Sequence, residues 1–565
     1  MRSLVPPLSF LLLASTPLLA QSPGAVVDLR EHIGFFSADI ADLERRYDVP
    51  MSAERRQRLR ERFEQEQREL AAMDFDALGR DARVDWLLLD NHVRRQLQGL
   101  DEDARRDDEV KELVPFAATI AGLCEARRRM EAVDAQACAS TMATLTETIE
   151  RVRTELREGE LDHVDLPIAA RAVDRMGDLR RALRSWFEYR DGYDPLFSWW
   201  VRAPYQAADA ALGNLQQGLQ AHNGKLAADS SLVGDPIGEA ALLRELAFEF
   251  IPYSPAELIA IAEREFAWCD AEMDKAAREM GCDDWRLALS KVKLHHRAPG
   301  EQPQMIVDLA REAITFLEQR DLITIPELAK ECWRMRMMSP QAQRVNPFFL
   351  GGETIQVSFP TDAMAHADKL QSLRSNNEHF CRATVHHELI PGHWLQQYSQ
   401  ARYRQYREPF ATPFWMEGWA LYWEMRMYDL GLARSPEDRV GMLYWRKHRC
   451  ARIVFSLNFH LGKWSGPQCS DYLIERVGHE RAAAEGEVRR SVGGGYGPLY
   501  QAAYMLGGMQ LRALHGELVG KGQQPEKAFH DEVLRHNSIP IALLRAAMSQ
   551  EPPPRPLPVW RFGGT

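Results

Sequence analysis

Two histidines and two glutamates in the second half of the chain have the types and spacing that suit a metal ion. The run His-Glu-Leu-Ile-Pro-Gly-His begins at His387 and ends at His393, and Glu417 follows about thirty residues after the first histidine. Two imidazoles and one carboxylate form the ligand set of many catalytic zinc sites, which leave a fourth position for water. Glu388, directly after His387, is then placed to act as the general base. These residues predict a zinc-dependent peptidase with Zn²⁺ as its cofactor.

The six-residue spacing of the two histidines does not fit one face of a regular helix. At roughly 100° per residue, six steps place the second imidazole about 240° from the first. Pro391 has no N–H to donate to the carbonyl of His387, and Gly392 tolerates the backbone angles that a bulge needs. We therefore expect His387 and His393 on a bulged or broken helix. The alternative is that Pro391 only ends one helix and His393 begins the next.

Two further residues complete or compete with this ligand set. Glu424 lies two helical turns after Glu417 on the same face, where its carboxylate can hold a ligand imidazole in the right tautomer. A solvated surface glutamate is the alternative. His386 is in phase with His393 on a regular helix but ~10.5 Å away along the axis. That separation strains metal–nitrogen bonds of about 2.0–2.1 Å, so His387 is the preferred ligand.

These motifs resemble the DUF885 family of bacterial proteins. The chain carries the pattern HExxPGHxxQ from His387 and the pattern EGWAxYxE from Glu417. The resemblance is strong over residues 235–550 and weaker over the helical region before them. It implies a distant similarity to helical zinc peptidases of the thimet oligopeptidase and neurolysin type. It also implies metal-ligand positions for His387, His393 and Glu417, with Glu388 as the base.

The same resemblance extends to a tyrosine near the C-terminus. Pro498, Tyr504 and Gly507 match the family pattern, whereas Tyr500 stands where the family has Gln and Met505 where it has Lys. In the related oligopeptidases a tyrosine after a glycine-rich loop donates to the oxyanion, which implies this catalytic role for Tyr504. The two departures bear on substrate preference rather than on the metal site.

A structural role for this tyrosine is the alternative. Tyr496, Tyr500 and Tyr504 are four residues apart, which is also typical of one packed stripe along a helix.

Length and charge agree with a globular enzyme. A chain of 565 residues can bury a large core, and 45% hydrophobic with 27% charged residues is ordinary for a soluble protein. The net charge of −11 argues against nucleic acid as a partner, because phosphate binding needs a basic face. A peptide is the expected partner.

The N-terminus resembles a secretory signal peptide. Arg2 supplies a positive charge, an apolar run covers Leu8 to Leu19, and Ala20 is a small residue at the expected cleavage point. The run is short for a membrane span of about 20 residues, so we expect no stable membrane anchor. No cysteine stands directly after Ala20, which argues against a lipoprotein. These features predict a periplasmic or secreted protein; an uncleaved anchor is the alternative.

The chain patterns predict a mostly α fold with two helical halves around a deep active-site cleft. The expected parts are the signal peptide at 1–20, an N-terminal helical region at 21–230 and a zinc-peptidase-like catalytic region at 231–565. Long amphipathic helices are expected at 52–73 and 110–129, with an aromatic break near 197–205.

One small β element is expected before the metal motif. Residues 353–359 alternate like a strand, most simply the strand of a hairpin. Its exposed edge could alternatively pair with an extended peptide substrate.

The eight cysteines allow two short disulfides. Cys124 with Cys138, and Cys269 with Cys282, each flank a charged stretch and could bridge in an oxidising compartment. Free buried thiols are the alternative. No cysteine spacing resembles a zinc site.

Two other functions compete with a peptidase. A zinc amidase or esterase would use the same chemistry, and a non-catalytic helical binding protein could keep the scaffold. Retention of Glu388 argues against the second, since a decayed enzyme could lose its base. The substrates expected from the resemblance are short, unstructured peptides.

Overall fold

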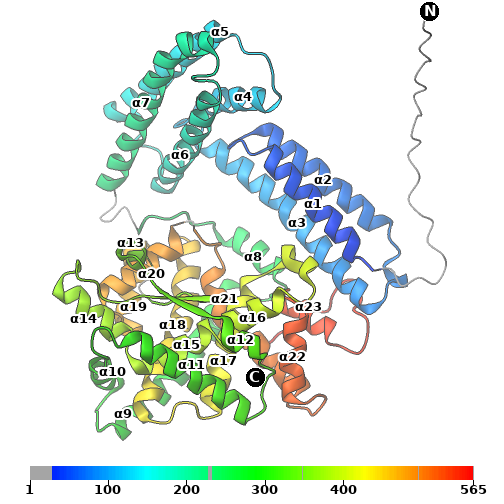
Figure 1. Ribbon diagram of the computed structural model, residues 1–565, viewed down its shortest axis with the longest axis vertical. Coiled ribbons are helices and arrows are strands. Elements are labelled where there is room, and N and C mark those ends of the chain that lie inside the picture. Colours follow the sequence, from blue (N-terminus) through cyan, green and yellow to red (C-terminus); the bar gives the residue numbers. More distant parts are fainter. Residues whose placement is uncertain (1–27, 227–231, 346–347, 494, 564–565) are drawn as a thin grey trace, which may run out of the picture.

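The computed structural model describes residues 28–226, 232–345, 348–493 and 495–563, and within them helices dominate (Figure 1). The expected mostly α fold is confirmed. The predicted signal peptide lies outside the described residues. No helix of the described part is long and apolar enough to cross a membrane.

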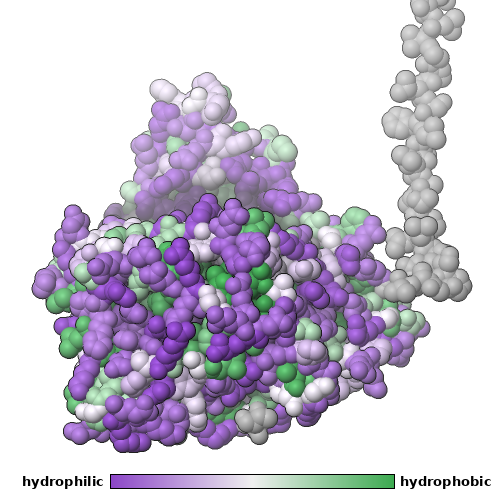
Figure 2. Space-filling view, turned by 60° about the horizontal axis from the view of Figure 1, so that its bottom comes forward, coloured by the Kyte–Doolittle hydropathy of each residue, from purple (hydrophilic) through white to green (hydrophobic). Residues whose placement is uncertain are grey.

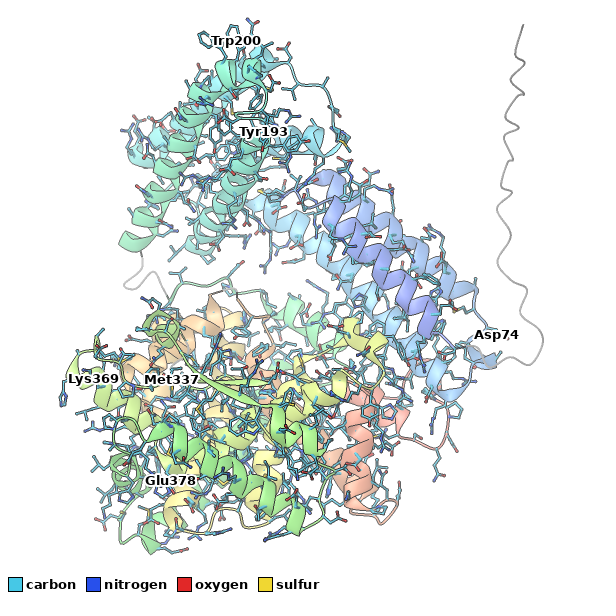
Figure 3. The ribbon with its side chains drawn as sticks, viewed as in Figure 1. Asp74, Tyr193, Trp200, Met337, Lys369 and Glu378 are labelled. Carbon is cyan, nitrogen blue, oxygen red and sulfur yellow. The ribbon has the colours of Figure 1, made fainter. Side chains whose placement is uncertain are left out.

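The chain forms three successive parts. The first is a bundle of three long helices with a short 3-10 turn: α1 (Arg30–Arg46), α2 (Ala53–Ala72), η1 (Phe75–Ala77) and α3 (Arg80–Glu109). The second, here called the arm, contains α4 (Ala117–Arg128), α5 (Ala135–Glu158), α6 (Leu166–Glu188) and α7 (Pro195–Leu226). Figure 1 shows the arm projecting beyond the end of α3. Trp200 lies at its outer end (Figure 3).

The third part, here called the body, contains the metal motif. Its helices are α8 (Glu239–Phe248), α9 (Pro255–Glu279), α10 (Trp285–Leu294), α11 (Gln302–Gln319), α12 (Glu327–Cys332), α13 (Pro340–Val345), α14 (His366–Ser375), α15 (Glu378–Glu388), α16 (His393–Gln400), η3 (Gln405–Phe410), α17 (Pro413–Asp429), α18 (Pro436–His460), α19 (Gly466–Val477), α20 (Arg481–Val492), α21 (Tyr500–Leu518), α22 (Glu526–Arg535) and α23 (Ile541–Ala547). Its strands are β1 (Arg334–Met337) and β2 (Thr354–Val357).

Two hydrophobic clusters divide the described residues. The larger joins residues 29–93 to residues 232–562, so α1, α2 and the first half of α3 share the core of the body. The smaller is built mainly from residues 110–219 and belongs to the arm. Helix α3 therefore begins in one core and ends at the edge of the other.

Local sequence signals explain most helix boundaries. Helix α2 begins after Ser52, whose hydroxyl accepts a hydrogen bond from the Arg55 N–H at 3.0 Å. The expected helix at 110–129 is shorter than predicted, because α4 begins only at Ala117. Pro115 explains the difference, since it lacks an N–H and disfavours helical geometry at the residue before it.

The expected aromatic break near 197–205 is wrong. Helix α7 runs through this segment with Pro204 inside it. Phe197, Val201 and Ala208 are fully buried, and Tyr205 nearly so. This continuous apolar stripe at helical spacing stabilises the helix across the proline.

The expected strand exists, but the expected hairpin is wrong. Strand β2 pairs in parallel with β1, with Met335 opposite Ile355. The crossover between them contains α13, as a parallel pair requires a connection longer than a tight turn. On its other side Gln356 forms an antiparallel bridge with Leu350. That second pairing brings the segment before β2 next to the metal motif.

All eight cysteines are free thiols. The two possible disulfides, Cys124 with Cys138 and Cys269 with Cys282, are therefore absent, and the alternative of free thiols describes the structure. Burial raises the pKa of Cys124 to about 11, which keeps it protonated. The face of the molecule shown in Figure 2 is mainly hydrophilic with scattered hydrophobic patches.

A buried ion pair fastens α3 to the body. Arg407 Nε donates to Asp85 Oδ1 at 2.7 Å, and the Tyr406 hydroxyl donates to Asp85 Oδ2 at 2.9 Å. The side chains of Arg407 and Asp85 are 0% and 2% exposed. We predict that Asp85→Ala lowers the free energy of unfolding by about 3–5 kcal/mol, because it leaves the guanidinium buried without a counter-charge. Urea denaturation measures this change.

The matched control breaks an exposed pair. Arg58 and Glu61 form an ion pair on the surface of α2, and Glu61→Ala should change stability little. Equal effects of the two substitutions would contradict the role of the buried pair.

Candidate metal centre

The helix that carries the first histidine is broken at Leu389. Helix α15 ends at Glu388 and α16 begins at His393. The Gly392 N–H donates to the carbonyl of His386 at 3.0 Å, and the Trp394 N–H donates to that of Leu389 at 3.0 Å. These bonds satisfy the backbone groups around the break while changing the direction of the chain.

Gly392 permits this turn. A Cβ atom at this position would lie 1.8 Å from the carbonyl oxygen of His387, which no side chain can tolerate. The indole of Trp419 holds the turn by donating to the Pro391 carbonyl at 2.8 Å. As a result the rings of His387 and His393, six residues apart, have centroids separated by only 4.8 Å.

The third predicted ligand comes from α17, which crosses α21 at very short range. A Cβ atom on Gly507 would lie 1.9 Å from the Phe414 carbonyl oxygen, and one on Gly418 would lie 2.5 Å from Gly507. Glycine at both positions lets the two backbones touch. Glu417 is thereby placed between the two histidines and the first turn of α21.

The three predicted ligand residues converge. Nε2 of His387 lies 3.5 Å from Glu417 Oε2, and Nε2 of His393 lies 3.3 Å from the same oxygen. All three donor atoms lie within 4.8 Å of one another. Tetrahedral ligands at about 2.0–2.1 Å from zinc are separated by roughly 3.3 Å. The spacing of the donor atoms therefore suits a metal ion.

One carboxylate oxygen of this cluster needs a partner. The Tyr500 hydroxyl donates to Glu417 Oε1, whereas the buried Oε2 makes no hydrogen bond with any described residue. An unpaired buried carboxylate oxygen is costly, and a cation between the three donors would compensate it.

A second layer of polar groups orients the imidazoles. Glu424 Oε1 lies 2.6 Å from His387 Nδ1, the contact expected from the sequence, and Arg449 donates to the same oxygen at 3.3 Å. The Gln396 amide lies 3.0 Å from His393 Nδ1, with its buried Oε1 unpaired. If the oxygen and nitrogen of the Gln396 amide are exchanged, its Oε1 accepts a hydrogen bond from Nδ1–H of His393. Nε2 of His393 then remains free for a metal.

The electrostatics of the cluster reflect its burial and its opposite charges. Burial lowers the pKa of His387, but the Glu417 and Glu424 carboxylates outweigh it and raise the pKa to about 9. Burial raises the pKa of Glu417, but His393 and His387 overcome it and hold the pKa well below the usual range. For Glu388 burial dominates and raises the pKa, which makes its carboxylate a stronger base.

The predicted base and the predicted ligands face one cavity of about 390 Å³. Every residue lining it lies between 348 and 504, including Gly351 just before β2 and Gln356 within it. Tyr496 lines both this cavity and a neighbouring one between the arm and the body, which Arg171 and Asp235 also line. The two cavities therefore meet at Tyr496.

Tyr504 lies beside the cluster. Its ring stacks on that of His387 with centroids 6.1 Å apart, and its hydroxyl makes no hydrogen bond with the described residues. Burial raises its pKa to about 12, so the phenol remains a hydrogen-bond donor. Tyr500 contacts the ring of Tyr504, and Tyr496 contacts that of Tyr500, although Tyr496 precedes α21. The three rings pack together and line the cavity at the same time.

Sequence reasoning missed most residues of this cavity, among them one tyrosine and three arginines. Tyr500 binds the predicted ligand carboxylate at a position treated only as a departure from the family pattern. Three arginines also line the cavity: Arg449, Arg452 and Arg490. For Arg449 and Arg452, the mostly apolar run from Ile453 to Leu457 could have indicated burial. An arginine within a buried apolar helix needs a buried partner or ligand.

Competing ligand sets have other partners. His386 is buried, with Nδ1 2.7 Å from the Arg382 carbonyl, and burial lowers its pKa to about 4. A second cluster in the described residues joins His515, Glu526 and His530. Both ring nitrogens of His530 already contact oxygen atoms at 2.7 Å. Glu526 forms a two-bond pair with Arg426.

A third cluster lies near the surface of the first bundle. It joins His32, Glu66 and Glu69. Its Glu66 is paired with both His32 and Arg62. Because their side chains already have hydrogen-bond or ion-pair partners, the second and third clusters suit a metal less well than the cluster of His387, His393 and Glu417.

The fold and site define a mostly helical protein with a candidate metal centre of two histidines and one glutamate. The chain belongs to the DUF885 family, described as bacterial protein of unknown function, whose model matches residues 31–548. No curated protein matches the chain.

A solved structure shares the fold. This structure, described as "a putative lipoprotein of unknown function from Shewanella oneidensis", has 17% identity and a TM-score of 0.68 and covers 92% of this chain and 100% of its own. Another, described as a "putative lipoprotein from Colwellia psychrerythraea", has 16% identity and a TM-score of 0.49 and covers 72% of this chain and 74% of its own.

We predict that alanine at His387, His393 or Glu417 abolishes stoichiometric zinc, because each removes one of three protein ligands. Glu424→Gln should weaken zinc affinity about 10- to 100-fold, as expected when the group that orients a ligand is lost. Metal content after dialysis and calorimetric titration with zinc measure both effects.

His515→Ala is the matched control, since it removes a histidine from the second cluster and should leave zinc binding unchanged. Wild-type affinity in the His393→Ala variant would refute the ligand assignment.

Proposed function

We propose that this protein is a zinc-dependent peptidase. The observation that carries the proposal is the convergence of His387, His393 and Glu417 at metal-ligand distances beside the Glu388 carboxylate in one cavity. The HExxPGHxxQ pattern and its resemblance to helical zinc oligopeptidases support the same activity.

The proposed chemistry divides between the metal and the chain. When bound, zinc supplies a Lewis acid that polarises the scissile carbonyl and acidifies water. Glu388 accepts a proton from the attacking water and later delivers it to the leaving amine. The raised pKa of Glu388 in its buried setting suits both proton transfers.

Two tyrosines have different proposed roles. Tyr504 keeps its hydroxyl free of hydrogen bonds to described residues, and from the cavity wall it can donate to the oxygen that becomes negative during attack. Tyr500 donates to Glu417 and so holds the ligand carboxylate in place. The first acts on the substrate and the second acts through a metal ligand.

We further propose that the substrates are short, unstructured peptides and that the protein is exported. A cavity of about 390 Å³ accommodates a few residues of extended chain. It opens toward a second cavity that the arm and the body line together. The charged and apolar N-terminal run described above supports export to the periplasm or the exterior.

We predict that Glu388→Gln retains zinc but loses most peptide hydrolysis, by a factor on the order of 10² or more, because an amide cannot accept the proton. Zinc content and kcat on a peptide library, measured on the same preparation, separate binding from chemistry. The control must lie outside the cavity, which excludes residues such as Gln397 that line it. Glu61→Gln on the surface of α2 is suitable. Undiminished hydrolysis by the Glu388→Gln variant would exclude this residue as the base.

Substrate form is tested by offering a folded protein and its own unfolded fragments in parallel. We expect the fragments to be cleaved and the folded protein to remain intact, since only an extended chain enters a small cavity. Mass spectrometry of the products measures this difference. Efficient internal cleavage of the folded protein would refute a restricted site.

A further inference from the structure

Three arginines form a cationic wall on the cavity side of Tyr504. The guanidinium carbons of Arg449 and Arg452 lie 4.7 Å and 4.3 Å from the centroid of the Tyr504 ring. Both residues come from α18 and are only 5% and 2% exposed. The third, Arg490, comes from α20 and lies 4.8 Å from the Tyr496 ring centroid. All three line the cavity that contains the predicted metal ligands.

The first two arginines are only partly used by protein carboxylates. Arg452 Nε donates to Glu487 at 2.6 Å, and Arg449 donates to Glu424 at 3.3 Å. Nη1 of Arg452 and Nε of Arg449 are buried and make no hydrogen bond with any described residue. Each guanidinium carries five N–H donors, so both keep donors for another acceptor.

Arg490 makes no hydrogen bond or ion pair with the described residues. Its Nε is buried without a hydrogen-bond partner, and its guanidinium packs over the Tyr496 ring. Leaving a charged donor unpaired in a buried setting is costly unless a ligand completes it. The two glutamates that line the same cavity, Glu388 and Glu417, lie on the side of the predicted metal ligands. Glu417 already accepts a hydrogen bond from Tyr500.

We infer that Arg490, with the unused donors of Arg449 and Arg452, forms a carboxylate-binding subsite next to the metal ligands. A planar guanidinium binds a carboxylate through two parallel hydrogen bonds, which suits this ligand better than a neutral amide. The carboxylate is either the free C-terminus of a peptide or the side chain of an aspartate or glutamate. Its assignment to a peptide rests on the proposed function.

The position of the subsite restricts where a bound peptide is cut. Arg449 and Arg452 contact the Tyr504 ring, which itself stacks on His387 at 6.1 Å. One residue of extended peptide spans ~3.3–3.6 Å, so a carboxylate held there lies at most about three residues from the metal ligands. A peptide anchored by its C-terminus is therefore cleaved within its last few residues.

The test measures binding with the Glu388→Gln chain, which cannot turn the ligand over. Three peptides are titrated calorimetrically: acetyl-Ala-Ala-Ala with a free carboxylate, the same peptide as its C-terminal amide, and acetyl-Ala-Glu-Ala amide. Each titration is repeated after metal removal, so that binding by the arginines is separated from binding by zinc.

We expect the carboxylate-bearing peptides to bind about tenfold or more tightly than the neutral amide, with or without metal. The free tri-alanine acid identifies the C-terminus as the ligand, and the glutamate-containing amide identifies an acidic side chain. Arg490→Gln should remove most of this preference, and Arg490→Lys should retain part of it because the charge remains without the planar fork.

Arg481→Gln is the matched control, because Arg481 lies on the same helix, is 64% exposed and pairs only with surface acids. Circular dichroism of each variant verifies folding, and the Lys variant decides the question if the Gln variant unfolds. Equal affinity for the acids and the neutral amide, absence of binding, or an undiminished preference in Arg490→Gln would overturn the subsite.

Activity of the wild-type chain separates this inference from the proposed function. Equal cleavage of peptides with and without a carboxylate, whether at the C-terminus or in a side chain, would refute the subsite and leave the peptidase intact. A carboxylate preference in binding, without cleavage of any peptide, would refute the peptidase and leave the subsite intact.

Discussion

The contact of α17 with α21 through Gly418 and Gly507 sets the width of the cavity at the candidate metal ligands. Because the two backbones touch, Glu417 on one helix meets Tyr500 on the other, and the Tyr504 ring reaches His387. Any side chain at the crossing would force the two helices apart. The donor spacing depends on this crossing as much as on the ligand residues themselves.

The polar groups around the cavity are paired in an ordered series. His387 contacts Glu424, which accepts from Arg449, and the adjacent Arg452 is paired with Glu487. Buried ionic groups of this kind are tolerated only when each has a partner, so removing one charge affects its neighbours. Several buried atoms depart from this rule, and Glu417 Oε2 and Arg490 Nε are two of them. They face the same cavity, one at its metal side and the other at its cationic side.

The sequence was sufficient for features that depend on local chemistry. Ser52 marked the start of α2, the Pro391-Gly392 pair marked the break between the histidines, and the seven-residue spacing predicted the place of Glu424. Features that depend on distant contacts were not accessible. Nothing near residue 353 reveals a parallel partner at 334, and the buried stripe through Pro204 outweighed a local signal that normally ends a helix.

The candidate site shows the same division. Its ligand residues follow from motif and spacing, whereas Tyr500, Arg449 and Arg490 join it only through the packing of α18, α20 and α21. Arginine is common on solvated helix faces, and its type and spacing do not distinguish that setting from a cavity wall.

Helix α3 gives this molecule a mechanical property. It starts in the core of the body and ends at the core of the arm, and its 30 residues extend for about 45 Å. A rod of this length amplifies rotation: a tilt of about 10° at its base displaces its far end by roughly 8 Å. Asp85 and Arg95 hold the first half of α3 in the body, and Arg106 pairs with Asp235 near its far end. A rotation of this rod would therefore move the arm only as these ion pairs rearrange.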